Sequence, residues 1–231
     1  MGVLLHLFIF RGTSMMKSID KRAVEIIKIL NKTYPKSRTS LHYKTPLQLL
    51  IATILAAQCT DERVNKITPS LFTKYKSSSD FARAQQKVLE EEIRSAGLYK
   101  NKAKNIIAAS KKMVEEFQGK VPDTMETLIT LPGVARKTAN IVLSSIFKKA
   151  EGIAVDTHVK RLSVRFGLSR EKNPDKIEQD LMKIVPRKYW LDLNYLLVNH
   201  GRKICMARKP VCPECAIKLL CPSSAIFYPD L

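Results

Sequence analysis

The sequence is poor in cysteine and in long apolar runs, and each shortage excludes a class of protein. Five cysteines among 231 residues are too few for a secreted scaffold held together by disulfides. The longest apolar run in the body of the chain, residues 49–57, is far shorter than the roughly 20 residues that a membrane span needs. We therefore expect no membrane insertion.

Acidic residues are also scarce relative to basic ones. The chain has 21 Asp and Glu against 40 Lys and Arg, which gives a formal net charge of +19. Such an excess points to a polyanionic partner, above all nucleic acid, and the alternative is a generally basic surface. With 45% hydrophobic and 26% charged residues the composition is that of a globular protein, which excludes disorder. The length fits one large domain or two small ones.

The first residues stand apart from the rest of the chain. Residues 2–10 are apolar like the centre of a secretion signal, but no basic segment precedes them and no convincing cleavage site follows. Met15 and Met16 offer a second start just before the helical pattern begins. We expect residues 1–16 to be a disordered tail or a start-site artefact. We also expect a cytoplasmic, nucleoid-associated protein that is not secreted.

Apolar residues recur at spacings of three and four along almost the whole chain, without an alternating strand pattern. This predicts an all-α fold. Thr45 is a candidate N-cap, and Pro46 follows it at the first helical position. The helix after them is apolar on all sides, which predicts a buried central helix ending near Ala57. The best domain boundary is the turn at residues 149–152. We expect helices at 19–30, 45–57, 63–75, 80–84, 88–95, 101–117, 121–130, 136–147, 157–166, 174–184 and 189–202.

Residues 131–140, Leu-Pro-Gly-Val-Ala-Arg-Lys-Thr-Ala-Asn, lie between two of these helices and predict a tight hairpin. Gly133 can adopt a positive φ and turn backbone amides toward a phosphate. Lys137 falls in the first turn of the second helix, where the helix dipole and Arg136 disfavour a charged ammonium. An uncharged lysine amine can attack the anomeric carbon of a deoxyribose and form a Schiff base. The alternative role for Lys137 is a phosphate contact.

A second motif is Ala-Val-Asp-Thr-His at residues 154–158. Asp156 stands where a helix N-cap belongs, and capping alone is one interpretation. The other is a carboxylate beside Lys137 that stabilises positive charge on a sugar ring or activates the nucleophile.

The third motif is a set of four cysteines within 17 residues, spaced C-x6-C-x2-C-x5-C. Four thiolates this close fit a [4Fe-4S] cluster or a tetrahedral zinc ion. Zinc sites usually show two Cys-x2-Cys pairs, and only one is present, which favours the cluster. Arg202 and Lys203 precede the first cysteine, either as cations for phosphates or as a solvated charge run. The proposed ligands are Cys205, Cys212, Cys215 and Cys221.

Together these motifs resemble the endonuclease III branch of the helix-hairpin-helix DNA glycosylases, over roughly residues 17–225. The resemblance implies two helical domains: a six-helix barrel with the hairpin at 39–150, and a cluster domain from 17–38 and 151–231. It gives Lys137 the role of the nucleophile and Asp156 that of the family's aspartate. It also makes the four cysteines ligands of a [4Fe-4S] cluster.

The same resemblance suggests DNA contacts. Gln58, in Ala-Ala-Gln-Cys-Thr-Asp at 56–61, would fill the hole left by a flipped base, and Leu98 would wedge the opposite strand. The alternatives are a helix-end amide and a core leucine. Gly133 and Ala135 belong to the hairpin, where Ala135 replaces the family's second glycine and costs stability if its φ is positive. His158 would contact phosphate or Asp156.

The implied function is a bifunctional DNA glycosylase and abasic-site lyase of base excision repair. It would remove oxidised pyrimidines through a lysine Schiff base and cut the strand by β-elimination. Its partner would be double-stranded DNA with damaged bases or abasic sites, bound by a monomer. One rival is an adenine-mismatch or thymine-mismatch glycosylase of the same superfamily, and another is a non-enzymatic, metal-stabilised DNA-binding module.

Overall fold

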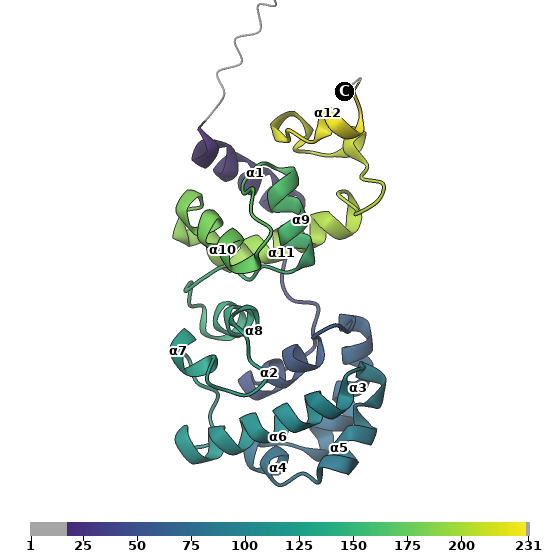
Figure 1. The fold of residues 1–231 in the computed structure, drawn as a ribbon, viewed down its shortest axis with the longest axis vertical. Coiled ribbons are helices and arrows are strands. Elements are labelled where there is room, and N and C mark those ends of the chain that lie inside the picture. The colour runs from purple at the N-terminus through teal and green to yellow at the C-terminus, as the bar shows by residue number, and fades with distance from the viewer. Residues whose placement is uncertain (1–17, 230–231) are drawn as a thin grey trace, which may run out of the picture.

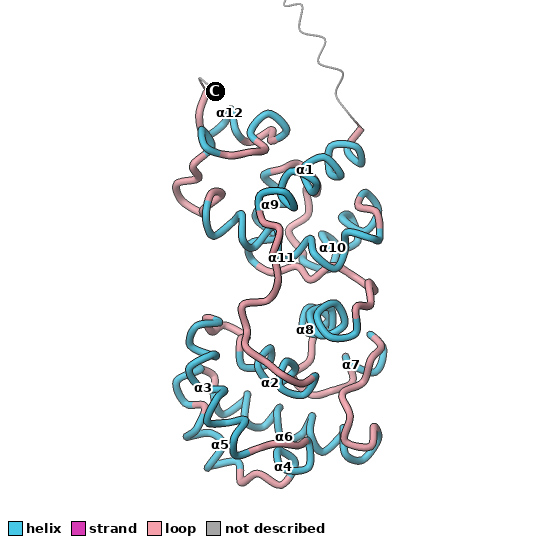
Figure 2. The backbone as a smooth tube through the Cα atoms, turned by 180° about the vertical axis from the view of Figure 1, so that it is seen from behind, coloured by secondary structure: helices cyan, strands magenta, loops and turns pink. Residues whose placement is uncertain are grey.

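The computed structural model describes residues 18–229, so the tail predicted at 1–16 lies outside the described residues. Within this range every regular element is a helix (Figures 1 and 2). The predicted all-α fold is therefore confirmed. The elements are α1 (Ile19–Thr33), α2 (Pro46–Leu55), α3 (Asp61–Lys74), α4 (Ser78–Ala82), α5 (Gln86–Glu92), η1 (Arg94–Ala96), α6 (Tyr99–Glu116), α7 (Met125–Leu128), α8 (Arg136–Val142), the π-helical η2 (Leu143–Phe147), α9 (Thr157–Arg165), α10 (Pro174–Ile184), η3 (Arg187–Tyr189), α11 (Trp190–Lys203), η4 (Cys212–Glu214), η5 (Lys218–Leu220) and α12 (Ser224–Phe227).

The predicted central helix is α2. The Thr45 hydroxyl accepts a hydrogen bond from the Gln48 amide at 3.2 Å, and Pro46 occupies the first turn. Every residue from Leu49 to Leu55 is buried, as expected of a helix that is apolar on all sides. The helix ends at Leu55, two residues earlier than predicted, and the turn that follows carries Gln58.

Two hydrophobic clusters form the interior. One runs from Leu41 to Leu143 and holds α2 to α8, in the lower half of Figure 1. The other joins α1 to residues 153–217 and holds α9, α10 and α11, in the upper half. We propose that these clusters are the cores of the two predicted domains. No helix among the described residues is long and apolar enough to cross a membrane.

Helix α1 and the segment near Leu220 meet beside the second cluster. Arg22 of α1 donates hydrogen bonds to the carbonyls of Phe166, Gly167 and Leu220. The guanidinium therefore ties the C-terminal segment and the end of α9 to the first helix, although Arg22 and Leu220 lie 198 residues apart in sequence.

The two clusters are joined where the end of η2 meets η3 and α11. Near the end of η2, the Ser145 and Tyr195 hydroxyls are 2.6 Å apart, and the Arg187 side chain donates to the Ala150 carbonyl at 2.9 Å. The end of the α8–η2 segment thus lies beside the start of α11.

Candidate active site

The predicted hairpin joins α7 to α8 through a turn anchored by the buried side chains of Leu131 and Val134. Gly133 has a φ of +80°, and a Cβ there would come within 2.8 Å of the Asn105 Cβ. The turn therefore requires glycine for its conformation and for space. Ala135 is the N-cap of α8 with a φ of −84°, which any L-residue adopts without strain. The expected cost of alanine at position 135 is absent.

The hairpin is fixed by a buried glutamate that the sequence did not single out. Glu178 of α10 is 4% exposed and accepts hydrogen bonds from the Arg136 Nε at 2.7 Å and the Asn140 amide at 2.8 Å. The Ile153 backbone amide donates to the same carboxylate at 3.1 Å. The hydrogen bond from Arg136 to this carboxylate raises the pKa of the guanidinium. Glu178 thus connects α8 to the segment that leads into α9.

Replacing this carboxylate should destabilise the fold. In Glu178→Gln the side-chain amide group cannot accept from all three donors, so at least one of them loses its partner, and the ion pair between the buried carboxylate and Arg136 is broken. We expect a loss of about 3 kcal/mol, within the range for breaking a buried pair, measured by urea unfolding. The control is Glu171→Gln, outside this network. Equal stabilities for Glu178→Gln and the native protein would contradict the role of Glu178.

Asp156 is the N-cap of α9, as the sequence predicted. Its Oδ1 accepts a hydrogen bond from the Val159 amide at 2.8 Å, and the residue is half-buried. Lys137 is exposed in the first turn of α8. Both residues begin helices, and the Glu178 contacts hold the segments that carry them.

His158 lies in the first turn of α9, and the charges of both Asp156 and Lys137 affect its pKa. Burial lowers the pKa of its imidazole, Asp156 opposes this, and the positive charges of Arg161, Arg202 and Lys137 lower it further. The lowered pKa favours the neutral imidazole, and the charges of Lys137 and Asp156 both act on it. Residues 137, 156, 158 and 202, far apart in sequence, therefore lie within electrostatic range of one another.

Arg161 and Gly201 complete this region, and neither was predicted from the sequence. The Arg161 guanidinium lies 3.2 Å from the His158 Nδ1 and donates to the carbonyls of Gly201 and Cys205, both at 3.1 Å. A Cβ on Gly201 would lie 2.8 Å from the His158 Nδ1. The glycine within α11 is therefore needed for the close approach of α9.

Arg202 and Lys203, the two cations expected beside the cysteines, both contact other side chains of the protein. Arg202 bonds to Asp61 at 3.1 Å, and its side chain is 48% exposed. The Lys203 ammonium lies over the Tyr34 ring, 5.7 Å from its centroid. Arg202 thus bridges α11 to the start of α3, in the motif that contains Gln58.

Gln58 and Leu98 share an unusual backbone conformation. Their φ angles are +54° and +48°, in the left-handed region that non-glycine residues avoid. Both side chains are exposed, and Leu98 is 55% exposed. The interpretation of Leu98 as a core leucine is therefore wrong. Gln118 and Lys148 are the other non-glycine residues of the described range with a positive φ. Such strain persists only where the surrounding structure maintains it.

The four predicted ligand cysteines surround one small cavity at the C-terminal end of the chain. The four residues line it together with Phe166, Ile204 and Pro210. Burial raises the pKa of the thiols of Cys212 and Cys221, and that of Cys215 to about 11. Thiolates in such surroundings need a positive partner.

Two side chains already offer hydrogen bonds to these sulfurs. The Arg165 guanidinium donates to the Cys205 Sγ at 3.3 Å. His200 is buried, with a pKa lowered to about 4, so its imidazole is neutral. Its Nε2 lies 3.4 Å from the Cys215 Sγ, and its Nδ1 lies 3.1 Å from the Tyr34 hydroxyl. With the hydroxyl donating to Nδ1, Nε2 carries the proton that faces the sulfur.

Comparison with known proteins identifies the family. The model of the HhH-GPD superfamily base excision DNA repair proteins matches residues 51–187. Endonuclease III of Synechocystis is 54% identical over 209 residues, which cover 90% of this chain and 95% of that protein. The chain belongs to the endonuclease III family. The Bacillus subtilis endonuclease III is 43% identical over 189 residues, covering 81% of this chain and 86% of its own.

Solved structures with a similar fold support membership of the endonuclease III family. A trapped endonuclease III–DNA covalent intermediate matches with a TM-score of 0.85 and 39% identity, covering 90% of this chain and 97% of that one. A thermostable thymine-DNA glycosylase matches with a TM-score of 0.81 at 25% identity. The predicted family and its enzyme class, DNA glycosylase and abasic-site lyase, are confirmed.

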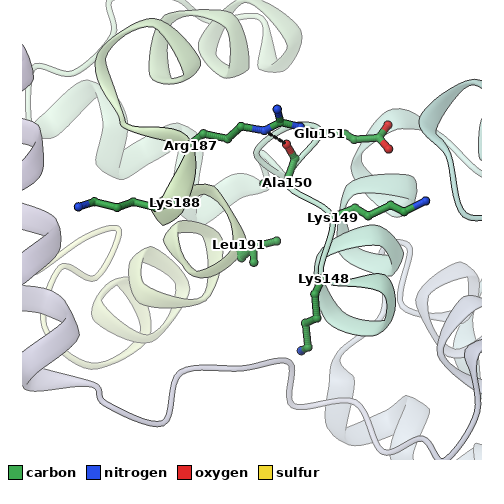
Figure 3. Close-up of a pocket in the computed structure, with 7 residues that line it drawn as sticks. All are labelled: Lys148, Lys149, Ala150, Glu151, Arg187, Lys188 and Leu191. Carbon is green, nitrogen blue, oxygen red and sulfur yellow. Dashed lines mark hydrogen bonds between the residues drawn. The ribbon is translucent and has the colours of Figure 1, made fainter.

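A pocket of about 530 Å³ lies between the residues that follow η2 and the start of α11 (Figure 3). The amines of Lys148, Lys149 and Lys188 point in different directions there, and Lys149 pairs with Asp123 at 2.6 Å. Polar groups that diverge do not form a specific ligand site. The pocket is lined by Lys148, Lys149, Ala150, Glu151, Arg187, Lys188 and Leu191, none of which is a predicted site residue.

Proposed function

We propose that the protein is a bifunctional DNA glycosylase and abasic-site lyase that removes oxidised pyrimidines from double-stranded DNA. The observation that carries the proposal is Lys137, an exposed amine whose charge acts on the same imidazole as Asp156. The similarity to a trapped endonuclease III–DNA covalent intermediate supports it, because a lysine nucleophile produces such an intermediate. We expect the protein to act as a monomer.

The damaged nucleotide must first leave the base stack. Extrusion costs a few kcal/mol and least for a damaged base. In the proposal, Gln58 occupies the vacated space and Leu98 wedges the opposite strand. Both side chains are already exposed on these turns, so neither has to leave the protein interior to enter the duplex.

The chemistry then proceeds at the sugar. The uncharged Lys137 Nζ attacks C1′ while the bond to the base breaks, and the electron pair and a proton leave with the base. Opening of the sugar ring gives an imine, and the Asp156 carboxylate stabilises the positive charge that develops. Loss of a proton from C2′ expels the 3′ phosphate by β-elimination. Water hydrolyses the imine and restores the lysine.

Activity on defined duplexes tests this function against its closest rivals. A duplex with one oxidised pyrimidine should be cut on the 3′ side of the lesion and leave an unsaturated aldehyde. Duplexes with an adenine or thymine mismatch should be cut much more slowly. Base release without strand cleavage, or preference for a mismatch, would support a mismatch glycosylase.

We propose further that Cys205, Cys212, Cys215 and Cys221 hold a [4Fe-4S] cluster. Four cysteines around one cavity, with hydrogen bonds from Arg165 and His200 to two of their sulfurs, fit a thiolate-bound group. Four cysteine thiolates are the usual ligands of such a cluster. When bound, it supplies iron–sulfur bonds that cross-link residues 205–221.

Metal analysis of the purified protein tests the cluster. We expect about four iron atoms and four inorganic sulfides per chain, as a cubane cluster requires. Cys215→Ser should lose most of the iron, because a serine oxygen is a poor ligand for it. The matched control is Cys59→Ser, which lies outside the ligand set and should retain the iron. One zinc per chain without sulfide would contradict the proposal.

A further inference from the structure

A buried lysine joins the two strained turns. Lys102, in α6, is only 4% exposed. Its ammonium donates hydrogen bonds to the carbonyls of Leu55 and Ala96, each at 2.8 Å. Leu55 is the last residue of α2, and Ala96 is the last residue of η1. One side chain therefore holds the ends of two helical segments that lie far apart in the sequence.

Each of these helix ends leads directly into a turn with a left-handed residue. Gln58 follows Leu55 by three residues, and Leu98 follows Ala96 by two. The backbone amide of Lys102 also donates to the Leu98 carbonyl at 3.0 Å. Lys102 thus contacts the Leu98 turn through both backbone and side chain, and the start of the Gln58 turn through its side chain.

The choice of lysine follows from these acceptors. The C-terminal carbonyls of a helix lack intrahelical partners and carry partial negative charge, which offsets the cost of burying an ammonium. Burial lowers the pKa of Lys102. An ammonium has three donors on a flexible stem and can serve two carbonyls at once. Methionine would fill the same space and leave both carbonyls buried and unpaired.

We propose that Lys102 is a positioning residue that holds the Gln58 and Leu98 turns at a fixed separation, so that both side chains enter the duplex together. This inference rests on the proposed function. It implies that Lys102 acts on extrusion of the nucleotide and not on the chemistry at C1′. Its loss should therefore matter for a base-paired lesion and hardly at all for an abasic site in a single strand.

Single-turnover rates on two substrates test this inference. We expect Lys102→Met to slow base removal from a duplex about 30-fold, since extrusion costs a few kcal/mol, and to change β-elimination on a single-stranded abasic site less than about 3-fold. Lys102→Arg, which retains the donors, should restore much of the duplex rate. The matched control is Lys104→Met, an exposed lysine of the same helix. A fluorescent base analogue opposite the lesion should report reduced extrusion in Lys102→Met only.

Equal losses on both substrates, or no loss on the duplex, would overturn the inference. If Lys102→Met does not fold, Lys102→Gln, which retains an amide donor, provides the same comparison. The single-stranded abasic site also separates the two proposals. A native protein that fails to cleave it contradicts the proposed lyase function, whereas the ratio of rates for the variants tests Lys102 alone.

Discussion

Lys137→Ala should abolish base release and strand cleavage, with a fall of about 10³-fold or more in the single-turnover rate, while duplex binding weakens only modestly. In the proposed reaction its amine is the group that forms the bond to C1′, so no neighbour can substitute. As a phosphate contact, Lys137 would contribute one charge among many on a chain of net charge +19. We therefore expect Lys137→Ala to lose the rate of base release while it keeps most of its affinity for the duplex.

Two further variants control this experiment. Lys137→Arg keeps the positive charge but cannot attack, since a guanidinium stays protonated, and should be as inactive as Lys137→Ala. Lys160→Ala removes an exposed charge from α9 and should retain the native rate. Activity of Lys137→Arg near the native level would assign Lys137 to phosphate binding and favour the DNA-binding alternatives.

Asp156→Asn should lower the rate of base release about 10²- to 10³-fold without lowering stability. Asparagine caps a helix as well as aspartate does, so α9 should keep its first turn. The carboxylate charge is lost, and charge stabilisation of this kind is worth a few kcal/mol in a transition state. The measurements are single-turnover kinetics and the thermal unfolding midpoint of the same preparations.

Asp156→Ala separates the two roles further. It removes both the cap and the charge, so stability should fall by about 1 kcal/mol while the rate falls as in Asp156→Asn. A native rate for Asp156→Asn combined with a destabilised Asp156→Ala would leave capping as the only role of Asp156.

Structural features that depend on neighbouring residues in the sequence, such as helix caps, could be predicted. The Thr45 and Asp156 caps follow from local residue types and are present. The helical pattern gave the order of elements with errors of a few residues at their ends. The cost at Ala135 was conditional on a positive φ and does not arise, because Ala135 has a φ of −84° and the turn takes its positive φ at Gly133.

Features that depend on pairs of remote residues could not be predicted. Glu178 and Lys102 are charged residues in amphipathic helices, and their sequences look like those of exposed positions. Each is buried because its partners come from other segments: the hairpin for Glu178, and the ends of α2 and η1 for Lys102. Gly201 is required by the approach of His158, which only the packing of α9 on α11 determines.

Borohydride reduction of the protein on a duplex with one abasic site tests the central claim most directly. The account predicts a covalent adduct of one protein chain and one strand, and peptide mapping should place the link on Lys137. Lys137→Ala should give no adduct, and Asp156→Asn should give it slowly. An adduct on another residue, or binding of the duplex without any adduct, would contradict the account.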